Sequence, residues 1–301
     1  MAEDKKYLAE LFGIRVDDVR EPGPSIASAK QGADAAASAR LGGQCLEEGD
    51  FEGAIRHFQT AVEQAGEKDA AFRADLAGVL ETADREADAL RQYRRLERGS
   101  PRPEAAAGIA DLYRRSGRFK TAVEELGKGI AANPQDPFLH HKLALTLSEA
   151  GHPSGAVAPA IRAIQLDTEN AFYSFWLGDL MIRLRRFDEA LAHFRAALEL
   201  SPGDDYYCLR ASVAFWGAGR REDAVLALQV ASELNAEDDL YPAVRETLRR
   251  ELGGGSESEW RAAMDEMDGF DLDRWVRLCK EYEIDPPSIE GLDSSSESAS
   301  R

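Results

Sequence analysis

A small residue recurs along this chain at a nearly constant interval of 33 to 35 residues. The alanines of one such series are Ala54, Ala89, Ala122, Ala156, Ala190 and Ala224. A second series lies 12 residues before each of these alanines: Gly42, Ala77, Ala110, Ala144, Gly178 and Ser212. A fixed period of this length indicates a stack of similar units, none of which can bury its apolar surface alone.

The unit at residues 171–204 has the clearest internal pattern. Apolar residues recur at three- and four-residue steps from Phe172 to Leu184 and again from Phe187 to Leu198. This spacing places an apolar stripe along one face of each of two helices. The pair Arg185-Arg186 lies between them and is predicted to form the turn of a helical hairpin. Other units have a glycine or aspartate at the turn: Gly49, Asp84, Gly117, Gly151 and Gly219.

The repeated unit resembles the tetratricopeptide repeat, whose pattern is W-x2-L-G-x2-Y…A-x3-F…P. The best copies are Leu41-Gly42 with Ala54-x3-Phe58, and Leu177-Gly178 with Ala190-x3-Phe194 and Pro202. The family tryptophan is absent from all six units, and Ala160 stands where an aromatic residue is usual. Six copies in register over residues 35–238 nevertheless imply an all-α, right-handed superhelical solenoid of about six helix-turn-helix repeats.

Further segments are expected on either side of the repeats. Residues 1–34 are predicted to hold a short helix from about Asp4, with apolar residues Tyr7 to Phe12, followed by a linker. This helix either packs on the first repeat or docks into another protein. Residues 239–252 are predicted to form a capping helix, and residues 253–285 a helical segment. A capping box of Ser256 and Glu259 starts this segment, and Asp271 is expected to cap its second helix. The acidic, Ser-rich tail, residues 286–301, is expected to be disordered.

The composition argues against several classes of function. A formal net charge of −18 repels phosphate backbones, so general nucleic-acid binding is not expected. No apolar run is long enough for membrane insertion. The N-terminus lacks the pattern of a secretory signal, so the cytoplasm is the expected location.

Nothing in the sequence indicates catalysis or a bound cofactor. The three cysteines, Cys45, Cys208 and Cys279, are scattered and suggest neither disulfides nor a thiolate metal site. The histidines show no metal-ligand spacing, and Gly253-Gly254-Gly255 is not followed by the Lys-Ser/Thr of a phosphate loop. We therefore expect no enzyme activity, no metal and no cofactor.

The resemblance implies that the first helix of each hairpin lines a concave groove. In repeats four to six the inward positions are largely apolar, whereas in repeats one to three they are small or polar. The candidate partner-binding residues are Phe138, His141, Leu145, Phe172, Phe175, Trp176, Asp179, Tyr206, Leu209, Val213 and Trp216. An apolar peptide or helix of a partner protein fits such a groove. The chain's own C-terminal segment, with Trp260, Met264, Met267 and Trp275, is an alternative occupant.

These features predict a protein–protein interaction scaffold or adaptor. Two alternatives remain open at the level of the sequence. One is an assembly or secretion chaperone that shields a client protein, for which a high net charge favours solubility. The other is a structural subunit of a larger complex, with the terminal helices as docking arms.

Overall fold

The computed structural model describes residues 26–66, 70–97 and 102–287. The helix expected within residues 1–25 and the tail from residue 288 onward lie outside this part of the chain. All regular elements in the described ranges are α-helices. They are α2 (Ile26–Glu47), α3 (Phe51–Ala65), α4 (Ala70–Thr82), α5 (Glu86–Leu96), α6 (Pro103–Arg115), α7 (Phe119–Ala132), α8 (Pro137–Glu149), α9 (Pro153–Leu166), α10 (Ala171–Arg183), α11 (Phe187–Leu200), α12 (Asp205–Gly217), α13 (Arg221–Leu234), α14 (Leu240–Glu251), α15 (Glu257–Glu266) and α16 (Gly269–Glu281).

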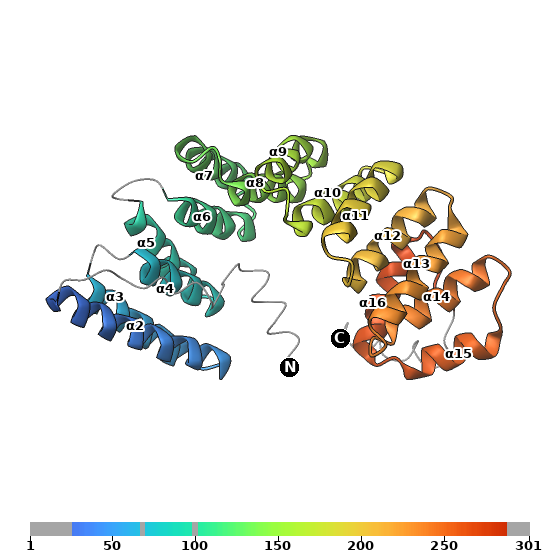
Figure 1. Ribbon diagram of the computed structural model, residues 1–301, viewed down its shortest axis with the longest axis horizontal. Helices are drawn as coiled ribbons and strands as arrows, with labels where there is room; N and C mark the ends of the chain where they lie inside the picture. Colours follow the sequence, from blue (N-terminus) through green and yellow to red (C-terminus); the bar gives the residue numbers. More distant parts are fainter. Residues whose placement is uncertain (1–25, 67–69, 98–101, 288–301) are drawn as a thin grey trace, which may run out of the picture. The chain divides into compact units, whose positions relative to one another are not determined.

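The chain divides into two compact units, residues 1–146 and residues 147–301, with the division inside α8. In the first unit, α2 packs against α3, α4 against α5, and α6 against α7. In the second unit, α10 packs against α11 and α12 against α13, and α14 contacts both α15 and α16 (Figure 1). The predicted all-α architecture of repeated helical hairpins is thus confirmed.

The recurring small residues lie where the helices of a hairpin meet. All six alanines of the first series are completely buried. A Cβ atom on Gly178 would lie 2.9 Å from Cε1 of Phe194, and one on Gly42 would lie 2.7 Å from Cε2 of Phe58. The glycine and the aromatic residue of the repeat pattern therefore form one contact: the ring lies against a helix backbone that carries no side chain at that point.

All six hairpin turns close in the same way. The residue at the centre of each turn has a positive φ, between 71° and 82° for the four glycines, 56° for Asp84 and 61° for Arg185. The next residue donates its backbone N–H to the carbonyl five positions earlier, as from Arg186 to Met181 at 2.9 Å. Glycine adopts this left-handed conformation without steric cost, whereas arginine does not.

Two helix starts differ from the sequence prediction. The first repeat helix, α2, begins at Ile26, within the stretch expected to be a linker. Asp271 is not the cap of α16. The N-cap is Asp268, whose carboxylate accepts hydrogen bonds from the backbone N–H groups of Phe270 at 2.8 Å and Asp271 at 2.9 Å. Asp271 lies in the first turn, where its carboxylate pairs with Arg274 at 2.8 Å.

Helix α14 lies within residues 239–252, and α15 and α16 lie within residues 253–285. The predicted capping box at the start of α15 is present, with both Ser256–Glu259 hydrogen bonds formed. Apolar side chains of α12 to α16 share one hydrophobic cluster, in which Trp275 and Tyr282 are almost completely buried. The C-terminal helices are therefore an integral part of the second unit.

Candidate partner-binding surface

Three aromatic side chains lie together at the beginnings of α10 and α12. Phe172 and Tyr206 are 45% and 46% exposed, while Phe175 is 9% exposed. The Phe175 ring centroid lies 6.3 Å from that of Phe172 and 5.6 Å from that of Tyr206. We call these three residues the aromatic face. In the aromatic face, the rings of Phe172 and Tyr206 are exposed to solvent, and the ring of Phe175 beside them is buried.

Local structure fixes the aromatic face. The side chain of Asn170 caps α10 by accepting a hydrogen bond from the backbone N–H of Phe172 at 3.1 Å. Asp204 caps α12 in the same way, accepting from Tyr207 at 3.1 Å. Phe175 stacks on Tyr207 with ring centroids 4.5 Å apart and an interplanar angle of 15°. Both helix starts and the central ring are therefore held in place from within the unit.

Trp176 and Asp179, the other predicted site residues of α10, are half-buried. Asp179 accepts hydrogen bonds from the guanidinium of Arg210 on α12, at 2.8 Å from Nε and 2.7 Å from Nη2. Arg210 also pairs with Glu281 at the end of α16. Burial disfavours the charged guanidinium, but Asp179 and Glu281 outweigh this effect and raise the pKa of Arg210 above its usual range.

The predicted residues further along α12 are covered by other parts of the chain. Leu209, Val213 and Trp216 are 2%, 2% and 7% exposed. The ring of Tyr282, just after α16, meets Trp216 edge-on at 6.0 Å, and its hydroxyl bonds to the hydroxyl of Ser212. Trp260, Met264, Met267 and Trp275 belong to the same hydrophobic cluster as these α12 residues. The surface of α12 is thus divided into an exposed beginning and a covered remainder.

The predicted residues of repeat four belong to the first unit. Phe138 occupies the position in its repeat that Phe172 and Tyr206 occupy in theirs, and it is 38% exposed. Leu145 is half-buried. His141 is only 6% exposed, and burial, aided by the charge of Lys142, lowers its pKa to about 3. The imidazole is therefore neutral near pH 7 and offers little area to a partner.

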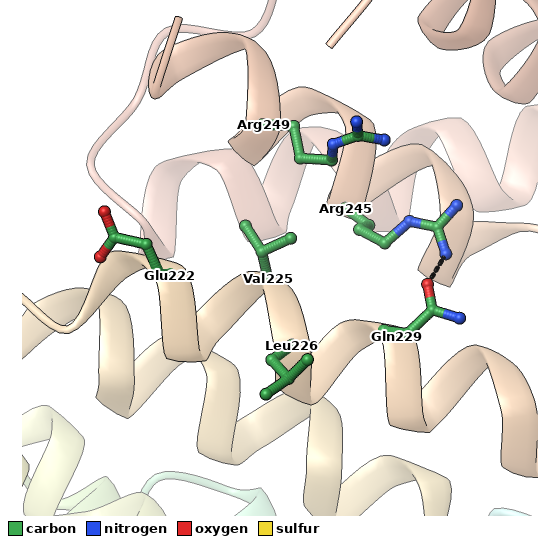
Figure 2. A pocket seen from close by; sticks show the side chains of 6 residues that line it. All are labelled: Glu222, Val225, Leu226, Gln229, Arg245 and Arg249. Carbon is green, nitrogen blue, oxygen red and sulfur yellow. Dashed lines mark hydrogen bonds between the residues drawn. The ribbon is translucent and has the colours of Figure 1, made fainter. Parts of the chain in front are cut away.

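A shallow pocket of about 290 Å³ lies elsewhere, between α13 and α14 (Figure 2). Figure 2 shows Val225 of α13 pointing toward α14, with Arg245 donating to the side-chain oxygen of Gln229. The full lining is Glu222, Val225, Leu226, Gln229, Arg245 and Arg249. Its volume is below the usual range for small-molecule sites.

Sequence reasoning missed two residues that contact the end of α16, Arg185 and Arg210. Arg185 donates from Nη1 to Glu283 at 2.5 Å and from Nη2 at 3.3 Å. The available signal was the position of Arg185, which replaces the glycine found at four of the other hairpin turns. No comparable signal pointed to Arg210, since its partner Glu281 lies 71 residues away.

Among residues 26–66, 70–97 and 102–287, no three or more His, Cys, Asp or Glu side chains are grouped to hold a metal ion. In the same part of the chain, every helix is too short or too polar to cross a membrane.

A family model described as tetratricopeptide repeat matches residues 46–102, 85–137 and 141–205, more than half of the chain. No curated protein matches the sequence. The solved structure of TTC0263, a thermophilic TPR protein of Thermus thermophilus, has a TM-score of 0.51 at 24% identity and covers 60% of this chain and 98% of its own.

Two other solved structures have TM-scores of 0.47. YrrB, described as a TPR protein with an unusual peptide-binding site, is 24% identical and covers 61% of this chain and 95% of its own. MamA from Desulfovibrio magneticus RS-1, from residue 41 to its end, is 17% identical and covers 59% of this chain and 95% of its own. At these identities, what the structural comparison with TTC0263 supports is the fold.

Proposed function

Since the chain belongs to the tetratricopeptide repeat family, whose members bind protein or peptide partners, we propose that it is an interaction scaffold and binds its partner through the aromatic face of α10 and α12. The observation that carries this proposal is the exposure of Phe172 and Tyr206 above the buried ring of Phe175. Exposed apolar clusters of this kind mark interaction sites.

The chemistry of the aromatic face favours an apolar peptide or an amphipathic helix as the partner. Aromatic side chains bring a large contact area while losing few rotatable bonds on binding. Phe175 is fixed by Tyr207 and Phe194, so the surface is ordered before the partner arrives. Preorganisation of this kind lowers the entropic cost of association.

In this proposal the chain's own C-terminal segment occupies part of the α12 surface. Its residues Tyr282 and Glu281 contact Ser212 and Arg210 on the covered part of α12. An external partner would then take the exposed aromatic face, while the chain's own α16 takes the adjoining part of α12. Phe138, His141 and Leu145 belong to the other unit, and the proposal depends on the residues of the second unit alone.

Affinity capture from a native lysate tests the aromatic face. We expect a partner retained by the wild-type chain to be lost when Phe172 and Tyr206 are changed to Ala, since aromatic hot spots contribute about 2–4 kcal/mol each. Leu200→Ala is the matched control, because Leu200 is 45% exposed on α11, outside the aromatic face. If the double variant keeps its helical content and captures the partner as well as the wild-type chain does, the aromatic face is not the binding site.

The same experiment separates the scaffold from its alternatives. A scaffold retains its partner in the mature assembly of that partner. A chaperone is found only with the unassembled client, and a structural subunit does not occur as a free monomer in the lysate.

A further inference from the structure

Three consecutive residues at the end of α16 each meet a matching group on the repeats. The Glu281 carboxylate pairs with Arg210, the Tyr282 hydroxyl bonds to Ser212, and the Glu283 carboxylate pairs with Arg185. We call Glu281, Tyr282 and Glu283 the α16 terminus. The acidic–aromatic–acidic sequence of the α16 terminus thus contacts Arg210, Ser212 and Arg185 in that order. The aromatic ring of Tyr282 also contacts Trp216.

Arg210 is suited to hold a carboxylate from outside its own helix pair. Its side chain is only 8% exposed, and a buried guanidinium requires charged partners. Asp179 supplies one carboxylate from α10, and Glu281 supplies the second. Without Glu281 the guanidinium has hydrogen-bonding capacity left for another carboxylate.

Arg185 and Glu283 meet in an unusual backbone geometry. Arg185 has a φ of 61° and Glu283 a φ of 58°, a conformation that residues other than glycine adopt at a steric cost. Their side chains are 59% and 65% exposed, so the ion pair between them contributes little to stability. The chain therefore places an arginine at this turn, where four other turns have glycine. Its guanidinium carbon lies 4.8 Å from the centroid of the Phe187 ring, and the guanidinium pairs with Glu283, so the arginine supplies a cation for a carboxylate that glycine could not supply.

The contacts of the α16 terminus are separate from those that hold α15 and α16 to α14. The indole N–H groups of Trp260 and Trp275 both bond to Thr247 of α14. These two tryptophans keep α15 and α16 attached to α14. Tyr282 is only 2% exposed, so displacement of the terminus also requires this ring to leave the cluster that it shares with Trp216. The carboxylates of the terminus are accessible, with Glu281 43% and Glu283 65% exposed.

We propose that the surface formed by Arg185, Arg210, Ser212 and Trp216 recognises an acidic–aromatic–acidic segment at a helix C-terminus. The α16 terminus is its resident occupant, and a partner segment of the same chemistry competes with it. This inference rests on the proposed function, for which it names the partner class on the same helices. The partner helix would then contact the aromatic face while its end replaces the α16 terminus.

A labelled peptide tests this competition in the full-length chain. The probe is an acetylated and amidated copy of residues 271–287 with Cys279→Ser, and its binding is followed by fluorescence anisotropy. In the wild-type chain the tethered terminus acts at an effective concentration of about 1 mM, so binding is expected to be weak. Glu281→Gln with Glu283→Gln weakens the resident occupant, and we expect the probe to bind at least about tenfold tighter, as for the loss of one to two charged contacts.

Matched variants make the result specific. Asp265→Asn with Glu266→Gln changes the same number of charges on exposed positions of α15 and should leave probe binding as weak as in wild type. Arg185→Gly, added to the weakened chain, should reduce probe affinity severalfold and raise Tm by about 2 °C, because it restores glycine at a left-handed position. If Arg185 had only a structural role, Tm would change without any change in probe affinity.

The outcomes separate this inference from the proposed function. The inference is overturned if the probe binds the Glu281→Gln, Glu283→Gln chain no more tightly than it binds wild type. It is also overturned if a probe with Gln in place of both Glu residues binds that chain as tightly as the original probe does. If partner capture still depends on Phe172 and Tyr206 in that case, the proposed function stands. If the probe binds as expected but partner capture is independent of Phe172 and Tyr206, the inference about the α16 terminus is supported. In that case the proposal that the aromatic face binds the partner is overturned.

Discussion

Thr247 connects the two indole rings of the C-terminal helices to α14. Its Oγ1 accepts hydrogen bonds from Nε1 of Trp260 at 3.1 Å and of Trp275 at 3.0 Å, and its hydroxyl donates to the carbonyl of Ala243 at 2.7 Å. All of these groups are buried. Because a buried donor without an acceptor costs about 1–3 kcal/mol, Thr247→Val should lower the free energy of unfolding of the second unit by about 3 kcal/mol.

Urea denaturation followed by tryptophan fluorescence measures this change. All four tryptophans lie between residues 176 and 275, so the signal reports on the second unit. Thr247→Ser is the control because it keeps the hydroxyl, and it should cost no more than about 1 kcal/mol, the value for one buried methyl group. Equal losses in the two variants would show that the hydroxyl is not what stabilises the tryptophans.

His141 should make the first unit sensitive to acid. Its pKa is lowered from the ordinary 6.5 to about 3 in the folded chain, so between these values the unfolded chain binds more protons. The contribution of His141 to the free energy of unfolding is fully present above pH 6.5. It is lost as the pH falls toward 3, with a slope of at most about 1.4 kcal/mol per pH unit. Replacement by Leu should flatten the pH dependence of unfolding over this window.

Circular dichroism at 222 nm during urea denaturation, at pH 7 and pH 4.5, provides the measurement. Comparison with the wild-type chain cancels the carboxylates that titrate in both proteins. His140→Leu is the control, since the neighbouring His140 is more exposed than His141. An unchanged difference between the two pH values in His141→Leu would contradict the assignment of a buried neutral imidazole.

Residue-level prediction from the sequence reached only part of the candidate surface. Counting positions along the repeats identifies Phe172 and Tyr206, which are exposed in the structure. The same count selects Val213 and Trp216, which are buried. The repeat pattern cannot distinguish these cases, because Val213 and Trp216 are buried in a cluster with Trp260, Trp275 and Tyr282 from the C-terminal segment. Local spacing contains no information on so distant a contact.

At the level of elements, α16 offers a test of helix capping. Asp268 accepts two backbone hydrogen bonds at the helix start, whereas the Asp271 carboxylate pairs with the side chain of Arg274. Asp268→Ala should therefore destabilise the second unit by about 1 kcal/mol, the usual value for a lost N-cap. Asp271→Ala should cost less than about 0.5 kcal/mol. Tryptophan fluorescence in urea checks both, and the reverse order would indicate that Asp271 is the cap.

The elements themselves were largely predictable. The recurring small residues, the turn glycines and the Ser256–Glu259 capping box each act over a few residues, so the sequence expresses them directly. Helix boundaries were less certain where two residues compete for one role. Asp268 and Asp271 are both good capping residues by type, and only the backbone geometry selects Asp268. The start of α2 at Ile26 was missed because helix continuation there gives no apolar periodicity.

For the molecule as a whole, we propose that the second unit binds the partner. The aromatic face, the covered part of α12 and the α16 terminus all lie between residues 172 and 283. The formal net charge of −18 disfavours acidic partners at a distance, so recognition of an acidic segment must come from local arginines. We therefore expect binding of the residue 271–287 probe to the weakened chain to fall as ionic strength rises, because the Arg185 pair is exposed.

Anisotropy titrations at about 50 mM and about 500 mM NaCl check this salt dependence. The concentrations span about 14 Å to about 4 Å of screening length, which covers the reach of an exposed ion pair. Binding that is unchanged or stronger at high salt would assign the affinity to apolar contacts and not to the arginines.

Site-directed photo-cross-linking tests partner binding by the aromatic face most directly, because it reports which residues touch the partner. A photoreactive phenylalanine analogue replaces Phe172 in one chain and Leu200 in another, and each is irradiated in native lysate before denaturing purification. We expect the chain labelled at Phe172 to form a cross-link to the partner captured by wild type, whereas the chain labelled at Leu200 does not. A cross-link to that partner from the Leu200 position and none from the Phe172 position would contradict the assignment.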